Sequence, residues 1–249
     1  MLVAVFAGPS IFGVDPSELE GLCLYPPAVC GDLLRVAQRS AGAIGLIDGA
    51  FESAPAVWHK EILAALSQGV AVFGASSMGA LRAAECCDFG MVGIGDIFDA
   101  YRTGLRKADA DVAVVHAPEA LHYRPLTEAL VNVEATIARV LDLALISAEE
   151  AAALIAAARG IHFKERDWTG IVAATNMPGN RRADVLELVK TCAVNQKRND
   201  ARSLLKRMRE LAAGHALKIP AFPGAFHRTV FFAALESRVI RARRRAGND

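Results

Sequence analysis

Three short apolar runs near the start of the chain limit the folds that it can adopt. They are LVAVFA at 2–7, AIGLI at 43–47 and VAVF at 70–73, and a glycine follows each run within two residues. Runs of this length and composition are typical of buried strands. The segments between them, 31–40 and 54–67, have helical patterns. The order strand, helix, strand, helix, strand predicts a parallel sheet.

The rest of the chain continues this pattern and then changes. A helix is expected at 78–87, a loop with a short helix at 88–101, and a further strand at 111–116, where the sequence is DVAVVH. Beyond about residue 125, alanine-rich and leucine-rich segments predict helices. These segments are 126–142, 147–159, 181–195 and 199–213.

The predicted fold class is therefore α/β, with a parallel-sheet N-terminal region followed by a mainly helical C-terminal region. We divide the chain into an α/β core at 1–125 and a helical region at 126–249, which can be a separate unit or pack as one unit with the core.

Composition excludes several classes of function. The chain has 28 basic and 27 acidic residues, so no overall field attracts nucleic acid or a membrane surface. Five cysteines without a C-x-x-C pair fit reduced thiols in the cytoplasm. The apolar start lacks a basic segment and a cleavage pattern, and is expected to be a strand. Nucleotide and metal motifs are missing from the sequence, so no cofactor is expected.

The strand ends carry the candidate site. Ligands of parallel sheets bind outside the carboxyl ends of the strands, where this sequence has Ser10, Asp48, Ser76 and Ser77. Ser77 stands between a strand and the first turn of a helix, where free backbone N–H groups can stabilise an oxyanion. It is our candidate nucleophile. Serine is also a common helix cap, and spacing alone does not separate the two roles.

Lys60 is the candidate base for Ser77. Its helical neighbours three and four residues away include Val57, Leu63 and Ala64, which are apolar. Burial without an acidic partner favours a neutral amine, which can accept the proton of a serine hydroxyl. The alternative is a surface lysine whose stem lies on apolar residues.

Further residues can support the site. Asp48 and Glu52 could orient Lys60 or a substrate, and Arg82 could bind an anion or form an ordinary ion pair with Glu85. His59 points to a different helix face from Lys60, which makes a joint role doubtful. Ser76 offers a second hydroxyl beside Ser77.

The segment IGLIDGAFESAPAVWHKEILAALSQGVAVFGASSMGALRAAE resembles the TfuA-like family. Further matches are FAGPS, YPPAVCGDL, FGMVGIGDIF and DVAVVH, so the resemblance covers roughly 3–120. It implies a partner of a YcaO enzyme, which makes peptide thioamides in the biosynthesis of peptide natural products or in modified enzymes. The family serine corresponds to Ser77 and the family lysine to Lys60, while Ser76 stands where alanine is usual.

The resemblance further implies that this Ser-Lys pair hydrolyses the thiocarboxylate of a ThiS-like sulfur-carrier protein and releases sulfide. It also implies that the protein helps YcaO to hold its peptide substrate. Two alternatives stay open. One is a non-catalytic adaptor that binds YcaO and its peptide, suggested by the helical half and the basic tail at 238–245. The other is a sulfur relay through Cys86 and Cys87.

Overall fold

A parallel sheet forms the centre of the molecule. The computed structural model describes residues 2–39, 41–215 and 220–246, and within these ranges five strands form one sheet in the order β2-β1-β3-β4-β5. The register is parallel throughout. The strands are β1 (Leu2–Phe6), β2 (Cys23–Tyr25), β3 (Ala41–Leu46), β4 (Ala71–Ala75) and β5 (Val92–Ile94). The predicted parallel sheet is thus confirmed, with the edge strands β2 and β5 added.

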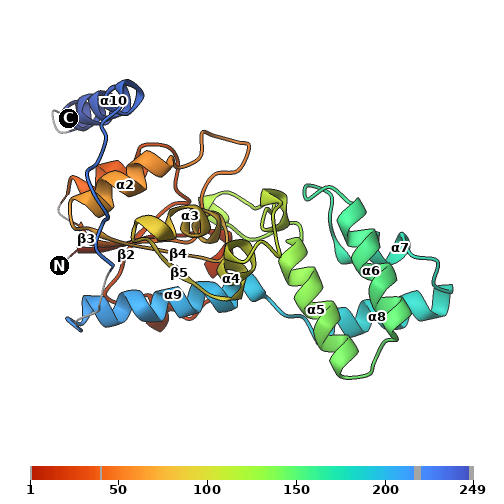
Figure 1. Cartoon of the computed structure of the whole chain (residues 1–249). Helices are drawn as coiled ribbons and strands as arrows, with labels where there is room; N and C mark the ends of the chain where they lie inside the picture. The colour runs from red at the N-terminus through yellow and green to blue at the C-terminus, as the bar shows by residue number, and fades with distance from the viewer. Residues whose placement is uncertain (1, 40, 216–219, 247–249) are drawn as a thin grey trace.

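Helices cover both faces of this sheet (Figure 1). On one face, α1 (Asp32–Ala37), α2 (His59–Ser67) and α3 (Met78–Cys86) bury apolar side chains against the strands. On the other face, α9 (Gln196–Ala212) packs Leu204 and Met208 against β1, β3 and β4. Helix α9, which lies far along the chain from the strands, therefore covers this face of the sheet.

The remaining helices form an arm and a cap. An apolar cluster of their own holds together α5 (Leu130–Asp142), α6 (Ala148–Gly160), α7 (Trp168–Ala173) and α8 (Gly179–Thr191). These helices extend to one side of the sheet domain in Figure 1. Near the C-terminus, α10 (Val230–Ala246) packs on α1 and α2, and its side chains from residue 243 on lie outside the described residues. The mainly helical C-terminal region is confirmed.

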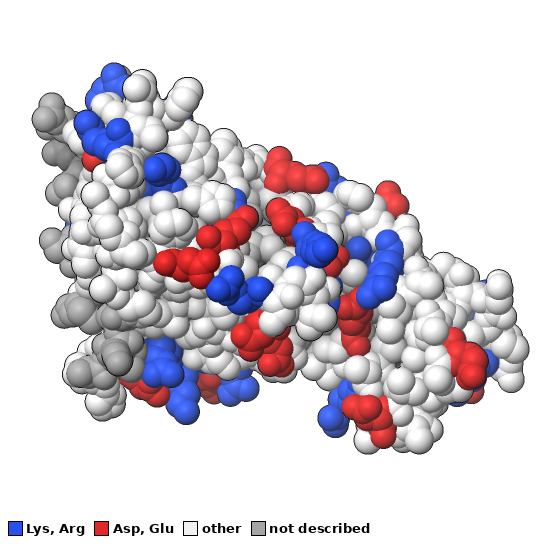
Figure 2. Space-filling view, in the orientation of Figure 1, with Lys and Arg blue, Asp and Glu red and all other residues white. Residues whose placement is uncertain are grey.

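Shorter elements complete the chain. A short helix, α4, spans Asp96–Arg102. The 3-10 helices are η1 (Pro9–Ile11), η2 (Pro16–Leu19), η3 (Cys87–Phe89), η4 (Asp109–Asp111) and η5 (Glu119–Leu121). No helix within the described residues is both long enough and apolar enough to cross a bilayer. Basic and acidic side chains are interspersed on the face shown in Figure 2, as their nearly equal numbers suggest.

The predicted strand at 111–116 is wrong. Its apolar alternation is real, but β5 already occupies the sheet edge beside β4. The segment follows η4 instead and makes only an isolated bridge between His116 and Pro125. The carbonyl of Val112 in this segment accepts a hydrogen bond from a side chain rather than from a strand. The second predicted helix begins at His59 and not at Ala54, because the residues before it form an irregular loop.

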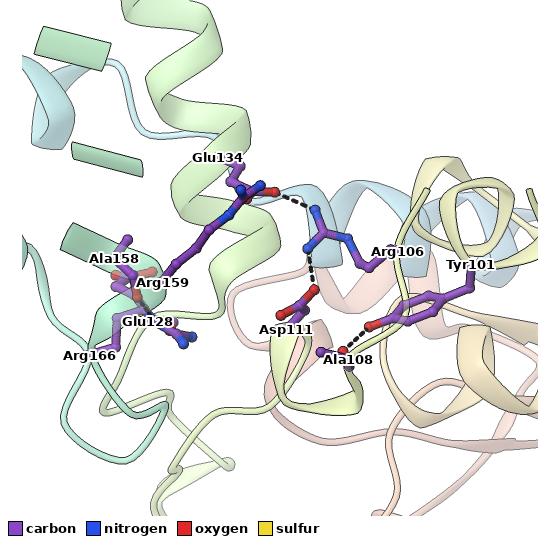
Figure 3. A network of polar contacts seen from close by, with 9 residues as sticks. All are labelled: Tyr101, Arg106, Ala108, Asp111, Glu128, Glu134, Ala158, Arg159 and Arg166. Carbon is purple, nitrogen blue, oxygen red and sulfur yellow. Dashed lines mark hydrogen bonds and ion pairs between the residues drawn. The ribbon is translucent and has the colours of Figure 1, made fainter. Parts of the chain in front are cut away.

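A polar network joins the arm to the sheet domain (Figure 3). Arg106 donates to Asp111 at 2.7 Å and to Glu134 on α5. Arg159 of α6 donates to Glu134 at 2.8 Å. Charged groups of opposite sign that share partners in this way fix orientation as well as adding stability. The network holds α5 and α6 against the loop that contains η4.

Asp200 on α9 is a buried carboxyl group that joins this helix to α4. Its Oδ2 accepts from Ile97 N at 2.9 Å, and its Oδ1 accepts from Gln196 Nε2 at 2.7 Å. Gly95 precedes α4 with a φ of 96°, and a Cβ there would lie 2.3 Å from Asp200 Cγ. Burial outweighs the hydrogen bonds and raises the pKa of Asp200 to about 6.

We predict that the Asp200 carboxyl makes folding stability fall as pH rises. Its folded pKa is about 6, above its ordinary value of 3.8, so its contribution is fully present below pH 3.8 and is lost as pH rises through 6. The expected loss is about 3 kcal/mol. Urea unfolding between pH 4 and pH 7 should show this slope in the wild type and a flatter one in Asp200→Asn. Asp142→Asn, at an exposed position, should keep the wild-type slope.

Candidate active site

The carboxyl ends of β1 and β3 meet beside a buried carboxylate. In this strand order the chain reverses its direction of winding between these two neighbours, and such switch points leave a crevice for ligands. Asp48 follows β3 and is 2% exposed. Its Oδ2 accepts from Gly8 N at 2.8 Å and from Ser10 N at 3.0 Å, and its Oδ1 accepts from Ser10 Oγ at 2.7 Å. Asp48 therefore ties the end of β1 to the end of β3.

The two serines after β4 differ in what their hydroxyls do. Ser76 is completely buried and donates to Ser10 Oγ at 2.9 Å, which links it to Asp48 through Ser10. Ser77 is 9% exposed and lines a cavity. It occupies the N-cap position of α3, yet its side chain makes no capping hydrogen bond. The capping role that sequence left open for Ser77 is therefore not the one that its hydroxyl performs.

The turn that presents Ser77 is sharp and closely packed. Ser76 has a φ of 69°, a left-handed conformation that a residue with a side chain adopts at a cost of about 1–3 kcal/mol. Gly74 and Gly79 lie against each other, because a Cβ on Gly74 would be 2.1 Å from Gly79 O. Gly79 N donates to Ile47 O at 3.1 Å, which seats the start of α3 on the end of β3.

The start of α3 leaves a backbone donor beside Ser77. Among the described residues, the N–H of Met78 makes no hydrogen bond to the protein, whereas that of Gly79 is taken by Ile47. A free N–H directly after a candidate nucleophile is where an oxyanion would be stabilised. The partial positive charge of the helix N-terminus adds to this effect.

Ser77, Asp48 and Glu52 line one cavity of about 340 Å³. Segments that follow four strands, β1 to β4, meet there with residues from the arm and from α9. Phe51 and Phe163 form an aromatic pair 5.5 Å apart on its wall. Glu52 pairs with Lys164 at 2.7 Å, and this ion pair lowers the pKa of Glu52. The other lining residues are Pro9, Pro27, Gly49, Ala50, Ser53, Ala113, Val114, Val115, His116 and Lys197.

Lys60 does not line this cavity. It is half-buried at the start of α2, where its Nζ donates to His227 O at 3.0 Å and lies 5.3 Å from the ring of Phe226. Both partners belong to the segment that leads into α10. In the described part of the chain, no hydrogen bond joins Lys60 to Ser77. In the structure the two predicted catalytic residues therefore share neither a hydrogen bond nor this cavity.

His59 and Arg82 also lie outside the cavity. His59 Nε2 lies 2.8 Å from Glu85 Oε2, and Arg82 forms with Glu85 the ion pair that their spacing predicts, at 2.6 Å. Arg82 Nε also donates to Val57 O at 2.9 Å. These contacts join α2 to α3.

Sequence reasoning missed Lys197, which is 3% exposed and lines the Ser77 cavity. A signal for it was present. With Ala201, Leu204, Met208 and Leu211 it follows the spacing of one helix face, and the other four residues are apolar and buried. A lysine on the buried stripe of a helix is an exception that calls for a reason.

Cys86 and Cys87 stand apart from this chemistry. Cys86 is buried in the core under the sheet, and burial raises the pKa of its thiol to about 12. A thiol in this state is a poor nucleophile. Within the described residues no group of histidine, cysteine or acidic side chains is arranged to hold a metal ion.

Comparison with known proteins gives one result. Residues 48–167 match the model of a family described as TfuA-like protein. The match contains Ser77 and Lys60, begins later than the resemblance that sequence suggested, and extends past residue 125 into the arm. No curated protein matches the chain.

We predict that Gly79→Ala severely destabilises the protein. The added Cβ would lie 1.8 Å from Leu46 O, so the start of α3 would have to move off β3. The expected loss is about 3 kcal/mol or more. Gly160→Ala is the matched control, because a Cβ there meets nothing within 4 Å. Thermal unfolding of both variants measures the effect, and equal melting temperatures would contradict the close packing described here.

Proposed function

We propose that this protein works with a YcaO enzyme in peptide backbone thioamidation, because residues 48–167 match the model of the TfuA-like family. In this proposal it hydrolyses the C-terminal thiocarboxylate of a ThiS-like sulfur carrier and so releases sulfide for YcaO. The observation that carries the proposal is the Ser77 hydroxyl, which is free of a capping bond and lines a cavity at the N-terminus of α3.

The chemistry requires attack on an anion. A thiocarboxylate is a weak electrophile, so the negative charge that develops on its oxygen needs stabilisation. The Met78 N–H and the α3 N-terminus supply it beside Ser77. Ser77 Oγ bonds to the carbonyl carbon, the carbon–sulfur bond breaks, and sulfur leaves as HS⁻ with the serine proton. Water then hydrolyses the ester to a carboxylate and restores Ser77.

The cavity suits the tail of a carrier protein. Its volume of about 340 Å³ is enough for a few residues of extended chain, but not for a folded domain. Its wall combines the aromatic pair of Phe51 and Phe163 with polar groups from the strand ends. Recognition sites of this kind use apolar surface for affinity and a few polar groups for orientation.

The resemblance assigns the base to Lys60. In the structure the amine of Lys60 is bound to His227 O. To act on Ser77, it would have to leave this carbonyl and the adjoining segment before α10, for example when a partner displaces them. The assignment of Ser77 as nucleophile does not depend on this movement.

A non-catalytic adaptor is the second candidate. It is supported by exposed large apolar side chains at the start of α10, Val230 and Phe231, which are typical of protein-binding surfaces. An adaptor would contribute to thioamidation without chemistry at Ser77. The two candidate functions therefore predict different results for a variant that lacks the Ser77 hydroxyl.

We predict that Ser77→Ala slows sulfide release from a purified thiocarboxylated carrier by about 10³-fold or more. Ser203→Ala, on the exposed side of α9, should retain the wild-type rate. In a reconstituted reaction that contains YcaO, ATP, peptide and the Ser77→Ala variant, added free sulfide should restore thioamidation. Full carrier-dependent thioamidation by this variant without added sulfide would instead favour the adaptor.

A further inference from the structure

Lys197 is a buried lysine without an acidic partner. It is the second residue of α9, and its Nζ donates to Val112 O at 2.6 Å. None of the ion pairs among the described residues includes it. Buried lysines are rare unless they are paired, because desolvation of the ammonium group is costly. Its position in a cavity therefore suggests a functional reason.

Two asparagines fix the start of α9 and with it Lys197. Asn132 Oδ1 of α5 accepts from Lys197 N at 3.0 Å, and Asn195 Oδ1 accepts from Arg198 N at 2.9 Å. Asn132 Nδ2 also donates to Asn195 Oδ1 at 3.3 Å. From this anchored turn the side chain enters the cavity that Ser77 also lines. Two parts of the fold that are 120 positions apart thus supply one site.

The charged groups around Lys197 offset only a small part of the cost of burying its ammonium group. Burial lowers the pKa of Lys197, and the charge of Asp48 opposes this shift to a smaller extent. The Asp48 carboxylate is already occupied by three hydrogen bonds from Gly8 and Ser10. The titratable and charged groups in the two cavities that Lys197 lines are Asp48, Glu52, His116, Lys164, Arg124 and Glu128.

We infer that Lys197 is the base that accepts the proton of Ser77 in the arrangement seen here. The inference rests on the proposed function only in that Ser77 is the nucleophile. A neutral amine that donates to Val112 O still has a lone pair for the hydroxyl proton. The Ser77 proton moves to Nζ as Oγ bonds to carbon, and the resulting ammonium gives this proton to the departing sulfur. No oxidant or metal is needed.

Lys197 and Lys60 differ in what each must do to reach Ser77. Lys197 lines the cavity, whereas Lys60 lies outside it and donates to His227 O; in the described part of the chain neither amine is hydrogen-bonded to Ser77. Lys197 also lies outside residues 48–167, so the family match does not include it. Variants at Lys197 and at Lys60 can therefore be compared to find which amine activates Ser77.

A fluorophosphonate tests the inference without relying on the sulfur carrier. The reagent forms a bond between serine Oγ and phosphorus while fluoride leaves, so its rate reports how well the hydroxyl is activated. Labelling of the Ser77 peptide is followed by mass spectrometry in the wild type, in Lys197→Met, in Lys60→Met as the rival base, and in Lys206→Met as the control. We predict that Lys197→Met slows labelling by about 100-fold or more, and that Lys206→Met, at an exposed position on the same helix, leaves it unchanged.

The pH dependence of wild-type labelling gives a second readout that needs no variant. The rate should rise with pH to a plateau, with a midpoint well below the ordinary lysine value of about 10.4. Lys206→Met should show the same curve. A rate that rises with hydroxide without a plateau would overturn the inference, as would loss of labelling in Lys60→Met but not in Lys197→Met. Absence of labelling at Ser77 in the wild type would also overturn it.

The outcome is separable from that of the proposed function. If Lys197 controls labelling of Ser77 but the wild type releases no sulfide from a thiocarboxylated carrier, the proposed substrate is wrong and the inferred base stands. If the carrier is hydrolysed and Lys197→Met retains the wild-type rate, the inferred base is wrong and the substrate stands. Thermal unfolding of each variant establishes that it is folded.

Discussion

The buried carboxylate of Asp48 is the interaction on which the arrangement of the site depends. It accepts three hydrogen bonds from Gly8 and Ser10 and so joins the loop after β1 to the end of β3. Backbone bonds from Ala28 N to Asp48 O and from Asp48 N to Phe6 O add the end of β2 and a further link to β1. These three hydrogen bonds offset much of the cost of burying the acceptor. The loops after β1 and β3, which line the cavity, begin at the residues that these hydrogen bonds hold in place.

The turn after β4 is built on the same foundation. Ser76 reaches Asp48 through Ser10, and its strained backbone directs the next residue, Ser77, into the cavity. The close contact of Gly79 with the end of β3 sets the position of α3 and therefore of the free Met78 N–H. Ser76 and Ser77 are neighbours in sequence, but the Ser76 hydroxyl holds the turn in place, whereas the Ser77 residue lines the cavity.

Much of this could be predicted from sequence, because it depends on local patterns. Apart from Leu2, the residues of the runs at 2–7, 43–47 and 70–73 are buried, and burial on both sides gives a parallel strand a clear signature. The edge strands β2 and β5 have only three residues each, too few for a pattern, and 111–116 has a strand-like pattern without a free sheet edge. Lys197 was missed because α9 reads as a polar helix of the C-terminal region. The packing of α9 on the sheet places Lys197 in the cavity that Ser77 lines, and this packing is not visible in the sequence.

The proposed hydrolysis depends on covalent acylation of Ser77 by a thiocarboxylate. Acid quenching of the protein at short times after mixing with one equivalent of thiocarboxylated carrier, followed by mass spectrometry, tests it most directly. We expect a transient species with the summed mass of protein and carrier less H₂S, with the ester on the peptide that contains Ser77. Complete sulfide release while that peptide stays unmodified in every quenched sample would contradict it.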